Sequence, residues 1–193
     1  MSNLPLSEIV RRAAAGQAAL PRPLQATINL TSRCNSRCVY CSYGNPDYPH
    51  APDPSFATLE ALVRDLAQYG VRSLSLSGGE PFLRSDLADL IRLATSLGMV
   101  VTVVTNGTLL TLERAQELAA AGLVNLVISF DTLEDELYQQ IRGIPLAKPA
   151  SAFQVLQGYR RTNACIPRVV VNAVLTRLNY HYLLGHIEAL LPW

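Results

Sequence analysis

The sequence predicts an α/β fold, namely a partial (β/α) barrel of parallel strands with about five strand–helix units. Runs of strand-forming residues alternate with helical runs along the chain, which is typical of parallel strands joined by right-handed crossovers. Several strands also alternate apolar residues with hydroxyl and amide residues. One strand face is therefore expected to pack on helices while the other lines a polar lumen, which favours a barrel over an open sheet buried on both faces.

The strand pattern occurs in five runs, approximately 24–31, 71–77, 99–105, 124–131 and 168–176. In the second run, Leu74 and Leu76 share one face and Ser75 lies on the other. The fourth run alternates in the same way. The third run is rich in valine and alternates poorly, so it gives weaker support to a polar lumen.

Helical runs separate these strands. We expect helices around 59–66, 87–94, 112–119, 134–142, 152–161 and 180–190. The first three have apolar residues at helical spacing, whereas the fourth and fifth are less regular and have prolines between them. Thr111 is expected to cap the third helix at its N-terminus, and Gly70, Gly98 and Gly122 stand where helix C-caps belong.

Composition limits the classes of protein to which the chain can belong. It has 193 residues, of which 49% are apolar, enough for one domain with a sizeable core. We expect a lead-in helix and a proline-rich junction over 1–23, and a core domain over 24–193. The formal net charge is +1, so no basic field indicates a nucleic-acid partner. The longest apolar stretch, residues 99–104, is too short to cross a bilayer, so no membrane partner is expected.

Three of the four cysteines lie within eight residues, at Cys34, Cys38 and Cys41. This clustering does not make a disulfide framework, so we expect a reducing cytoplasm. Three soft thiolates without a fourth suit a 4Fe–4S cluster whose remaining iron is free to bind another ligand. The alternative is a zinc site closed by His50, nine residues past Cys41.

Polar residues follow the strands at their carboxyl ends, where α/β barrels build their sites. They are Gly78-Gly79-Glu80-Pro81, Thr105-Asn106-Gly107, Ser129, Asp131 and Asn172. Taken singly, each is also explained by a tight turn or by a side chain that satisfies backbone groups. Their joint occurrence beside the cysteines favours a site.

These residues together resemble the radical S-adenosylmethionine (radical SAM) superfamily. Its motif Cys-x3-Cys-x-aromatic-Cys is matched by Cys34, Cys38, Tyr40 and Cys41, and its Gly-Gly-Glu-Pro motif by residues 78–81. Supporting matches are Thr-Asn-Gly at 105–107, Ser-x-Asp at 129–131 and Arg142-Gly143. The resemblance extends from about Leu24 to Leu190, nearly the whole chain.

The resemblance implies a role for each matched residue. Cys34, Cys38 and Cys41 would hold a 4Fe–4S cluster and leave one iron for the amino and carboxylate groups of S-adenosylmethionine. Tyr40 is expected beside the cluster or the adenine. The Gly78 and Gly79 carbonyls and the Glu80 carboxylate would bind the ammonium of S-adenosylmethionine, and Arg142 its carboxylate. Ser129, Thr105 and Asp131 would bind the ribose or the carboxylate, with Asn106 and Asn172 nearby.

The implied reaction is reductive cleavage of S-adenosylmethionine to a 5′-deoxyadenosyl radical, which abstracts hydrogen from a substrate. That substrate is a peptide, a cofactor precursor or a small metabolite, and the electron donor is a protein such as flavodoxin or ferredoxin. A non-catalytic iron–sulfur protein for electron transfer or scaffolding is the alternative, as is a fragment able only to bind the cluster and S-adenosylmethionine.

The chain departs from the family at its C-terminal end. The family core has six strand–helix units and we count five, so the core is expected to stop before a sixth strand. Four explanations are open: a fragment, a truncated gene product, a partner that supplies the missing edge, or a minimal enzyme. Because an uncovered strand edge invites pairing, we expect self-association or a partner there. The remaining cysteine, Cys165, is expected to be a small buried residue.

Overall fold

The structure, a computed structural model, describes residue 11 and residues 15–16, 23–162 and 167–190. Most of the lead-in segment expected over 1–23 lies outside these residues, as does Cys165. The described elements, with η for a 3-10 helix, are β1 (Gln25–Asn29), η1 (Ser42–Gly44), α2 (Phe56–Tyr69), β2 (Ser73–Ser77), η2 (Pro81–Leu83), α3 (Leu87–Ser96), β3 (Val100–Thr105), α4 (Leu112–Ala120), β4 (Asn125–Ser129), α5 (Asp135–Arg142), α6 (Ala147–Thr162), β5 (Arg168–Asn172), η3 (Tyr180–Tyr182) and α7 (Leu183–Leu190).

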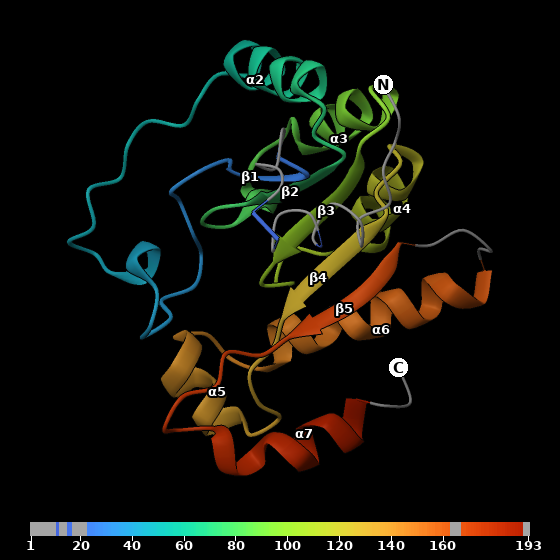
Figure 1. Cartoon of the computed structure of the whole chain (residues 1–193). Helices are drawn as coiled ribbons and strands as arrows, with labels where there is room; N and C mark the ends of the chain where they lie inside the picture. Colours follow the sequence, from blue (N-terminus) through green and yellow to red (C-terminus); the bar gives the residue numbers. More distant parts are fainter. Residues whose placement is uncertain (1–10, 12–14, 17–22, 163–166, 191–193) are drawn as a thin grey trace.

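The five strands form one parallel sheet in the order β1–β2–β3–β4–β5 (Figure 1). Each strand adds beside the previous one, so the sheet winds in a single direction, unlike a doubly wound sheet in which the strand order reverses. The predicted α/β class is therefore confirmed. The barrel is not closed, because β1 and β5 are the edge strands of the described sheet.

Rows of side chains across the sheet alternate between polar and apolar. One row consists of Thr27, Ser75, Thr102 and Asn125. The next consists of Ile28, Leu76, Val103 and Leu126. Asn125 Nδ2 donates a hydrogen bond to Thr102 Oγ1 at 3.1 Å, so the polar row is bonded across β3 and β4. The alternation predicted from the second and fourth strands is confirmed.

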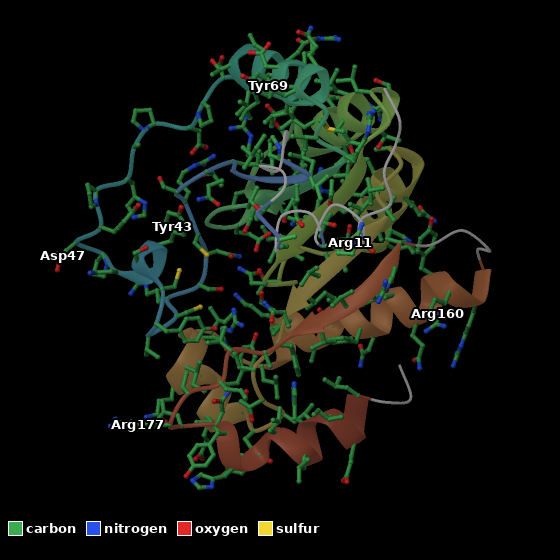
Figure 2. The ribbon with its side chains drawn as sticks, viewed as in Figure 1. Arg11, Tyr43, Asp47, Tyr69, Arg160 and Arg177 are labelled. Carbon is green, nitrogen blue, oxygen red and sulfur yellow. The ribbon has the colours of Figure 1, made fainter. Side chains whose placement is uncertain are left out.

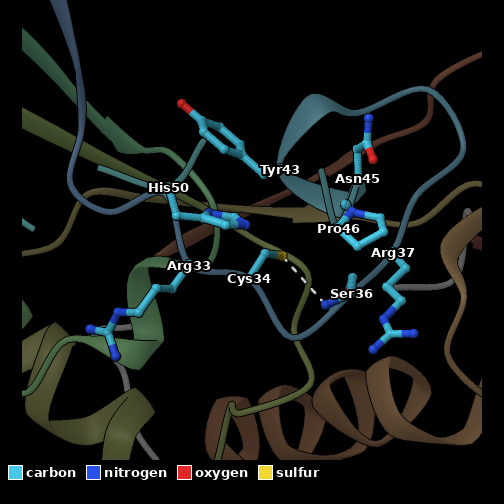
Figure 3. A pocket seen from close by; sticks show the side chains of 9 residues that line it. Arg33, Cys34, Ser36, Arg37, Tyr43, Asn45, Pro46 and His50 are labelled. Atoms are coloured by element: carbon cyan, nitrogen blue, oxygen red, sulfur yellow. Dashed lines mark hydrogen bonds between the residues drawn. The ribbon is translucent and has the colours of Figure 1, made fainter. Parts of the chain in front are cut away.

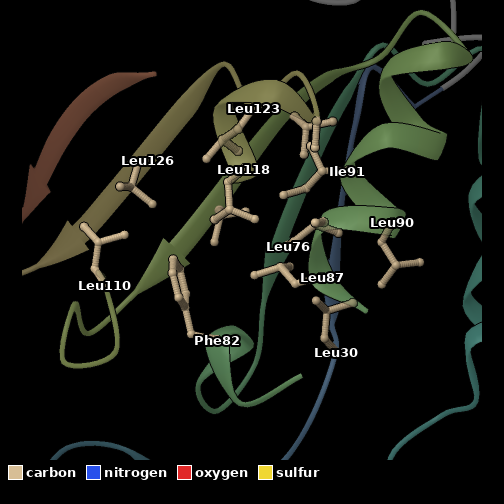
Figure 4. Packing of buried hydrophobic residues seen from close by; sticks show 14 of the residues in the cluster. Leu30, Leu76, Phe82, Leu87, Leu90, Ile91, Leu110, Leu118, Leu123 and Leu126 are labelled. Atoms are coloured by element: carbon tan, nitrogen blue, oxygen red, sulfur yellow. The ribbon is translucent and has the colours of Figure 1, made fainter. Parts of the chain in front are cut away.

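The apolar rows pack on helices to form the core. Figure 4 shows leucines of β2 and β4 facing Leu87, Leu90 and Ile91 of α3 and Leu118 of α4. Burial of one such side chain contributes about 1.5–3 kcal/mol, so this layer stabilises the sheet from one side. The structure also shows which valines of the third strand face the core: Val101 and Val103 are fully buried, whereas Val100 is 44% exposed.

Helix ends follow the expected signals with small shifts. The Thr111 hydroxyl caps α4 by accepting a hydrogen bond from Arg114 N, and Gly70 caps α2 in the left-handed conformation. Gly98 and Gly122 come one residue after the C-cap positions of α3 and α4. The helix expected from residue 152 begins at Ala147 instead, because a proline is tolerated in the first turn of a helix. Within the described part of the chain, every helix is too short or too polar to span a bilayer.

Candidate cofactor site at the carboxyl ends of the strands

The loop after β1 holds Cys34, Cys38 and Cys41 at the carboxyl edge of the sheet. All three are free thiols and half-buried. Two cavities flank the loop: one of about 260 Å³ includes Cys34 and His50 in its wall, and one of about 430 Å³ includes Cys38 and Cys41. Figure 3 shows Cys34 and His50 turned toward the first of them. Figure 2 shows the following turn, with Tyr43 and Asp47, extending away from the sheet.

The thiols interact electrostatically. Burial raises the pKa of Cys34 and of Cys38. The negative charges of Glu80 and Cys41 raise it further at Cys34, and those of Cys34 and Cys41 do so at Cys38. The Arg142 guanidinium opposes this effect at Cys38. Without a bound metal the two groups therefore favour the protonated thiol, and a metal that binds them must displace protons.

A mononuclear site is not assembled among the residues that the structure describes. No three histidine, cysteine, aspartate or glutamate side chains there converge on a position for one metal ion. Structural zinc needs four ligands around one ion, so the arrangement with His50 as fourth ligand is not formed. In a 4Fe–4S cluster, by contrast, each thiolate binds a different iron. Three free thiols on one loop have the chemistry that such a cluster requires.

The Gly78-Gly79-Glu80 turn supports the start of the cysteine loop. Gly79 N donates to Thr31 O at 2.7 Å, and Glu80 N donates to Arg33 O at 2.8 Å. Gly78 has a φ of +119°, and a Cβ atom at Gly79 would overlap the Arg33 carbonyl. Both positions therefore require glycine, because the two backbones approach too closely for a side chain.

Glu80 turns its carboxylate into the protein and is fully buried. Oε1 accepts hydrogen bonds from Phe82 N at 3.0 Å and Thr105 Oγ1 at 2.7 Å. Oε2 accepts from Asn106 N at 2.8 Å. Burial raises the pKa of this carboxyl group, and the three donors oppose that rise. In this structure the Glu80 and Thr105 side chains join the ends of β2 and β3, and their contact with a cofactor stays a prediction.

Asn106 fastens the cysteine loop to the end of β3. Its Nδ2 donates to Asn35 Oδ1 at 2.7 Å and Ser36 Oγ at 3.0 Å, and lies 4.0 Å from Cys34 Sγ. Its Oδ1 accepts from the backbone and hydroxyl of Thr108. Both polar groups of this side chain have partners within the protein, so Asn106 anchors the loop, and its contact with a cofactor stays a prediction.

Asp131 and Arg142 form a buried ion pair under the loop. Arg142 Nε and Nη2 lie 2.6 and 2.9 Å from the two carboxylate oxygens of Asp131. The Tyr40 hydroxyl donates to Asp131 Oδ2 at 2.6 Å, and Arg142 Nη1 lies 3.8 Å from Cys38 Sγ. Burial and the bond to Asp131 both raise the pKa of Tyr40. The fork of Arg142 is bound by Asp131 in this structure, and its contact with a ligand carboxylate stays a prediction, as do the cofactor contacts of Tyr40 and Asp131.

Ser129 and Asn172 lie side by side in the parallel register at the ends of β4 and β5. Ser129 is half-buried and Asn172 is exposed. Phe130 N donates to Asn172 O at 2.9 Å, which aligns the two strand ends. Their contact with a cofactor stays a prediction, as does that of the Gly78 and Gly79 carbonyls.

Sequence reasoning missed several residues of this network. Asn35 and Ser36 lie between Cys34 and Cys38 and accept hydrogen bonds from Asn106. Asn179, which is buried, donates from Nδ2 to Asp131 O at 3.1 Å. Val174 N also donates to Asp131 Oδ1 at 2.8 Å. No local pattern marks these residues, because their partners lie on distant strands.

The sequence of this chain matches a known protein family and several of its members. A model of the radical SAM superfamily matches residues 28–190. A PqqA peptide cyclase of Bradyrhizobium diazoefficiens is 36% identical over 163 residues, which is 83% of this chain and 41% of that protein. A GTP 3′,8-cyclase of Limosilactobacillus fermentum is 36% identical over 155 residues, which is 78% of this chain and 45% of that protein. The chain thus spans less than half the length of these two relatives.

The fold also matches solved structures. Streptococcus suis SuiB bound to S-adenosylmethionine superposes with a TM-score of 0.73 at 22% identity, over 93% of this chain and 40% of that one. BtrN in complex with AdoMet and 2-DOIA gives a TM-score of 0.59 at 21% identity, over 77% of this chain and 55% of that one. At these identities the superpositions show a shared fold.

Proposed function

Because this chain belongs to the radical SAM superfamily, we propose that it binds a 4Fe–4S cluster through Cys34, Cys38 and Cys41 and S-adenosylmethionine beside it. The cofactors of that superfamily are this cluster and S-adenosylmethionine. When bound, they supply one-electron cleavage of the sulfonium and, from it, a radical that removes hydrogen from a substrate. The three free thiols on one anchored loop carry the proposal.

The chain's own residues would position these groups. Asn106 and Arg142 contact Cys34 and Cys38. The Gly78-Gly79 turn is bonded to the start of the same loop, and we propose that its carbonyls face S-adenosylmethionine. Ser129 and Asn172 lie at the ends of the next strands, and we propose that they contact S-adenosylmethionine. The polar row of the sheet would face the lumen in which the ligand is held.

We propose that the whole protein is an enzyme acting on a peptide or a small molecule. Relatives named as peptide cyclases and as GTP cyclases support these two substrate classes. The reaction needs a low-potential electron donor such as flavodoxin or ferredoxin, and a reducing compartment such as the cytoplasm. The edge strand β5 is the place where a further strand, a partner or a second copy would add.

Anaerobic reconstitution with iron and sulfide tests the proposal. We expect about four irons and four sulfides per chain, the composition of the cubane cluster, and 5′-deoxyadenosine after addition of S-adenosylmethionine and dithionite. Alanine at Cys34, Cys38 or Cys41 should abolish the cluster, whereas Cys165→Ser should retain it. A chain that binds zinc in place of iron would contradict the proposal. A chain that takes up a full cluster but forms no 5′-deoxyadenosine would favour the alternative, a non-catalytic iron–sulfur protein or a fragment that only binds the cluster and S-adenosylmethionine.

A further inference from the structure

We propose that Arg142 tunes the reduction potential of the cluster from its position beside Cys38, and that Asp131 holds it there. The inference rests on the proposed function, because it requires a cluster on the three cysteines. It concerns a positioning residue, since Arg142 would act on the cluster through the sulfur of Cys38.

The position of Arg142 relative to Cys38 is fixed by the backbone. Arg37 N donates to Arg142 O at 2.9 Å, and Val39 N donates to Ile141 O at 2.9 Å. These bonds join the end of α5 to the residues on either side of Cys38. A Cβ atom at Gly143 would lie 2.8 Å from Arg37 Cβ, so glycine permits this close approach.

The side chain of Arg142 is equally constrained. Two of its nitrogens bind the carboxylate of Asp131, and the third, Nη1, lies 3.8 Å from Cys38 Sγ. The guanidinium also lies over the ring of Tyr40, 5.6 Å from its centroid. Because Asp131 and the Tyr40 ring already fix the guanidinium, it loses little conformational freedom when it donates a hydrogen bond to the Cys38 sulfur.

The charge of Arg142 is screened little by solvent. The side chains of Arg142 and Asp131 are 6% and 0% exposed. Charges in such a site interact more strongly than at a surface. By comparison, the donors near Cys34 are neutral, namely Ser36 N at 3.4 Å and Asn106 Nδ2 at 4.0 Å.

The sign of the effect follows from the charge of the cluster. Reduction adds one negative charge, and hydrogen bonds and charges near the sulfurs set the reduction potential. The cation of Arg142 favours the reduced cluster and raises the potential, whereas the anion of Asp131 lowers it. Removal of the positive charge of Arg142 and removal of the negative charge of Asp131 should therefore shift the reduction potential in opposite directions.

The experiment is a redox titration followed by EPR on the reconstituted full chain, without S-adenosylmethionine. Arg142→Gln should lower the midpoint potential and favour oxidised cluster about tenfold, which is about 59 mV for one electron. Asp131→Asn should raise it, because the amide oxygen can still accept a hydrogen bond from Arg142 while the negative charge is lost. Glu136→Gln is the control matched to Asp131→Asn, because it also removes one negative charge, but at an exposed position of α5. It should leave the potential unchanged.

Shifts of the two variants in the same direction, or no shift in either, would overturn the inference, because damage to packing has no reason to follow the sign of a charge. If a single variant does not fold, the double variant Arg142→Gln, Asp131→Asn decides, since it leaves no unpaired buried charge. Its potential should be below that of the wild type, because the cation nearer the sulfur is lost; an unchanged potential would overturn the inference.

The two proposals fail in distinguishable ways. A wild-type chain that takes up no iron and sulfide would refute the proposed function and with it the role of Arg142. A wild-type chain with a full cluster, whose potential is the same in all the variants, would refute the role of Arg142 alone.

Discussion

The hydroxyl of Tyr40 donates a 2.6 Å hydrogen bond to Asp131, which lies 91 residues further along the chain. This bond ties the cysteine loop to the end of β4. The same carboxylate binds Arg142 of α5 and the backbone of Val174 beyond β5. One buried carboxylate therefore joins three segments: the cysteine loop, α5 and the chain after β5.

Tyr40→Phe should destabilise the protein by about 1.5–3 kcal/mol, the usual contribution of a hydrogen bond to a charged group. The ring remains to pack against Arg142, so the loss reports on the hydroxyl alone. Urea unfolding of the apo-protein measures the change. Tyr69→Phe is the control, since this tyrosine is 66% exposed on α2 (Figure 2) and its change should have no effect. Equal stabilities for the two variants would mean that the Tyr40–Asp131 bond contributes nothing.

Gly79→Ala should displace the cysteine loop, because the added Cβ would overlap the Arg33 carbonyl. We expect less iron per chain after reconstitution and a lower urea midpoint. Gly158→Ala in α6 is the matched control: a Cβ there meets nothing within 4 Å. Alanine at that helical position should be neutral or stabilise by about 1 kcal/mol. Full cluster uptake by Gly79→Ala would show that the loop does not need this close approach.

Glu80→Gln tests whether the buried carboxylate acts as an anchor. Glutamine has the same shape, but its amide nitrogen would face a donor among Phe82 N, Thr105 Oγ1 and Asn106 N. The free energy of unfolding should fall by about 1–3 kcal/mol, the cost of a buried donor left unsatisfied. Urea unfolding and iron analysis should both register the change. A variant with normal stability but weaker binding of S-adenosylmethionine would instead place Glu80 in contact with the ligand.

The sequence predicted those parts of the site that depend on local pattern. The spacing of Cys34, Cys38 and Cys41 along the chain places the three cysteines on one short segment, whatever the rest of the fold. The period of two in β2 likewise determines which of its side chains share a face. The partners of Glu80 and Arg142 could not be predicted in this way. Whether a carboxylate faces a ligand or an internal donor depends on the distance between strand ends, which no spacing along the chain determines.

We predict that His186 makes the stability of the fold depend on pH. This buried side chain of α7 bonds through Nε2 to Phe130 O at 3.0 Å, so Nε2 carries the hydrogen. Nδ1 is buried without a partner among the described residues, and a proton there would have no acceptor. Burial lowers the pKa of His186, while the Phe130 carbonyl and Asp131 oppose this shift.

Because burial lowers the pKa of His186 in the folded protein, the unfolded chain takes up the proton first, at a pKa of about 6.5. Stability should therefore be constant above that pH and should fall as the pH drops below it, by at most about 1.4 kcal/mol per pH unit. Urea unfolding at pH 7.5 and pH 5.5 measures the loss. His186→Gln keeps a donor for Phe130 O but does not titrate, so its stability should depend less on pH. The same pH dependence in both proteins would assign the effect to other groups.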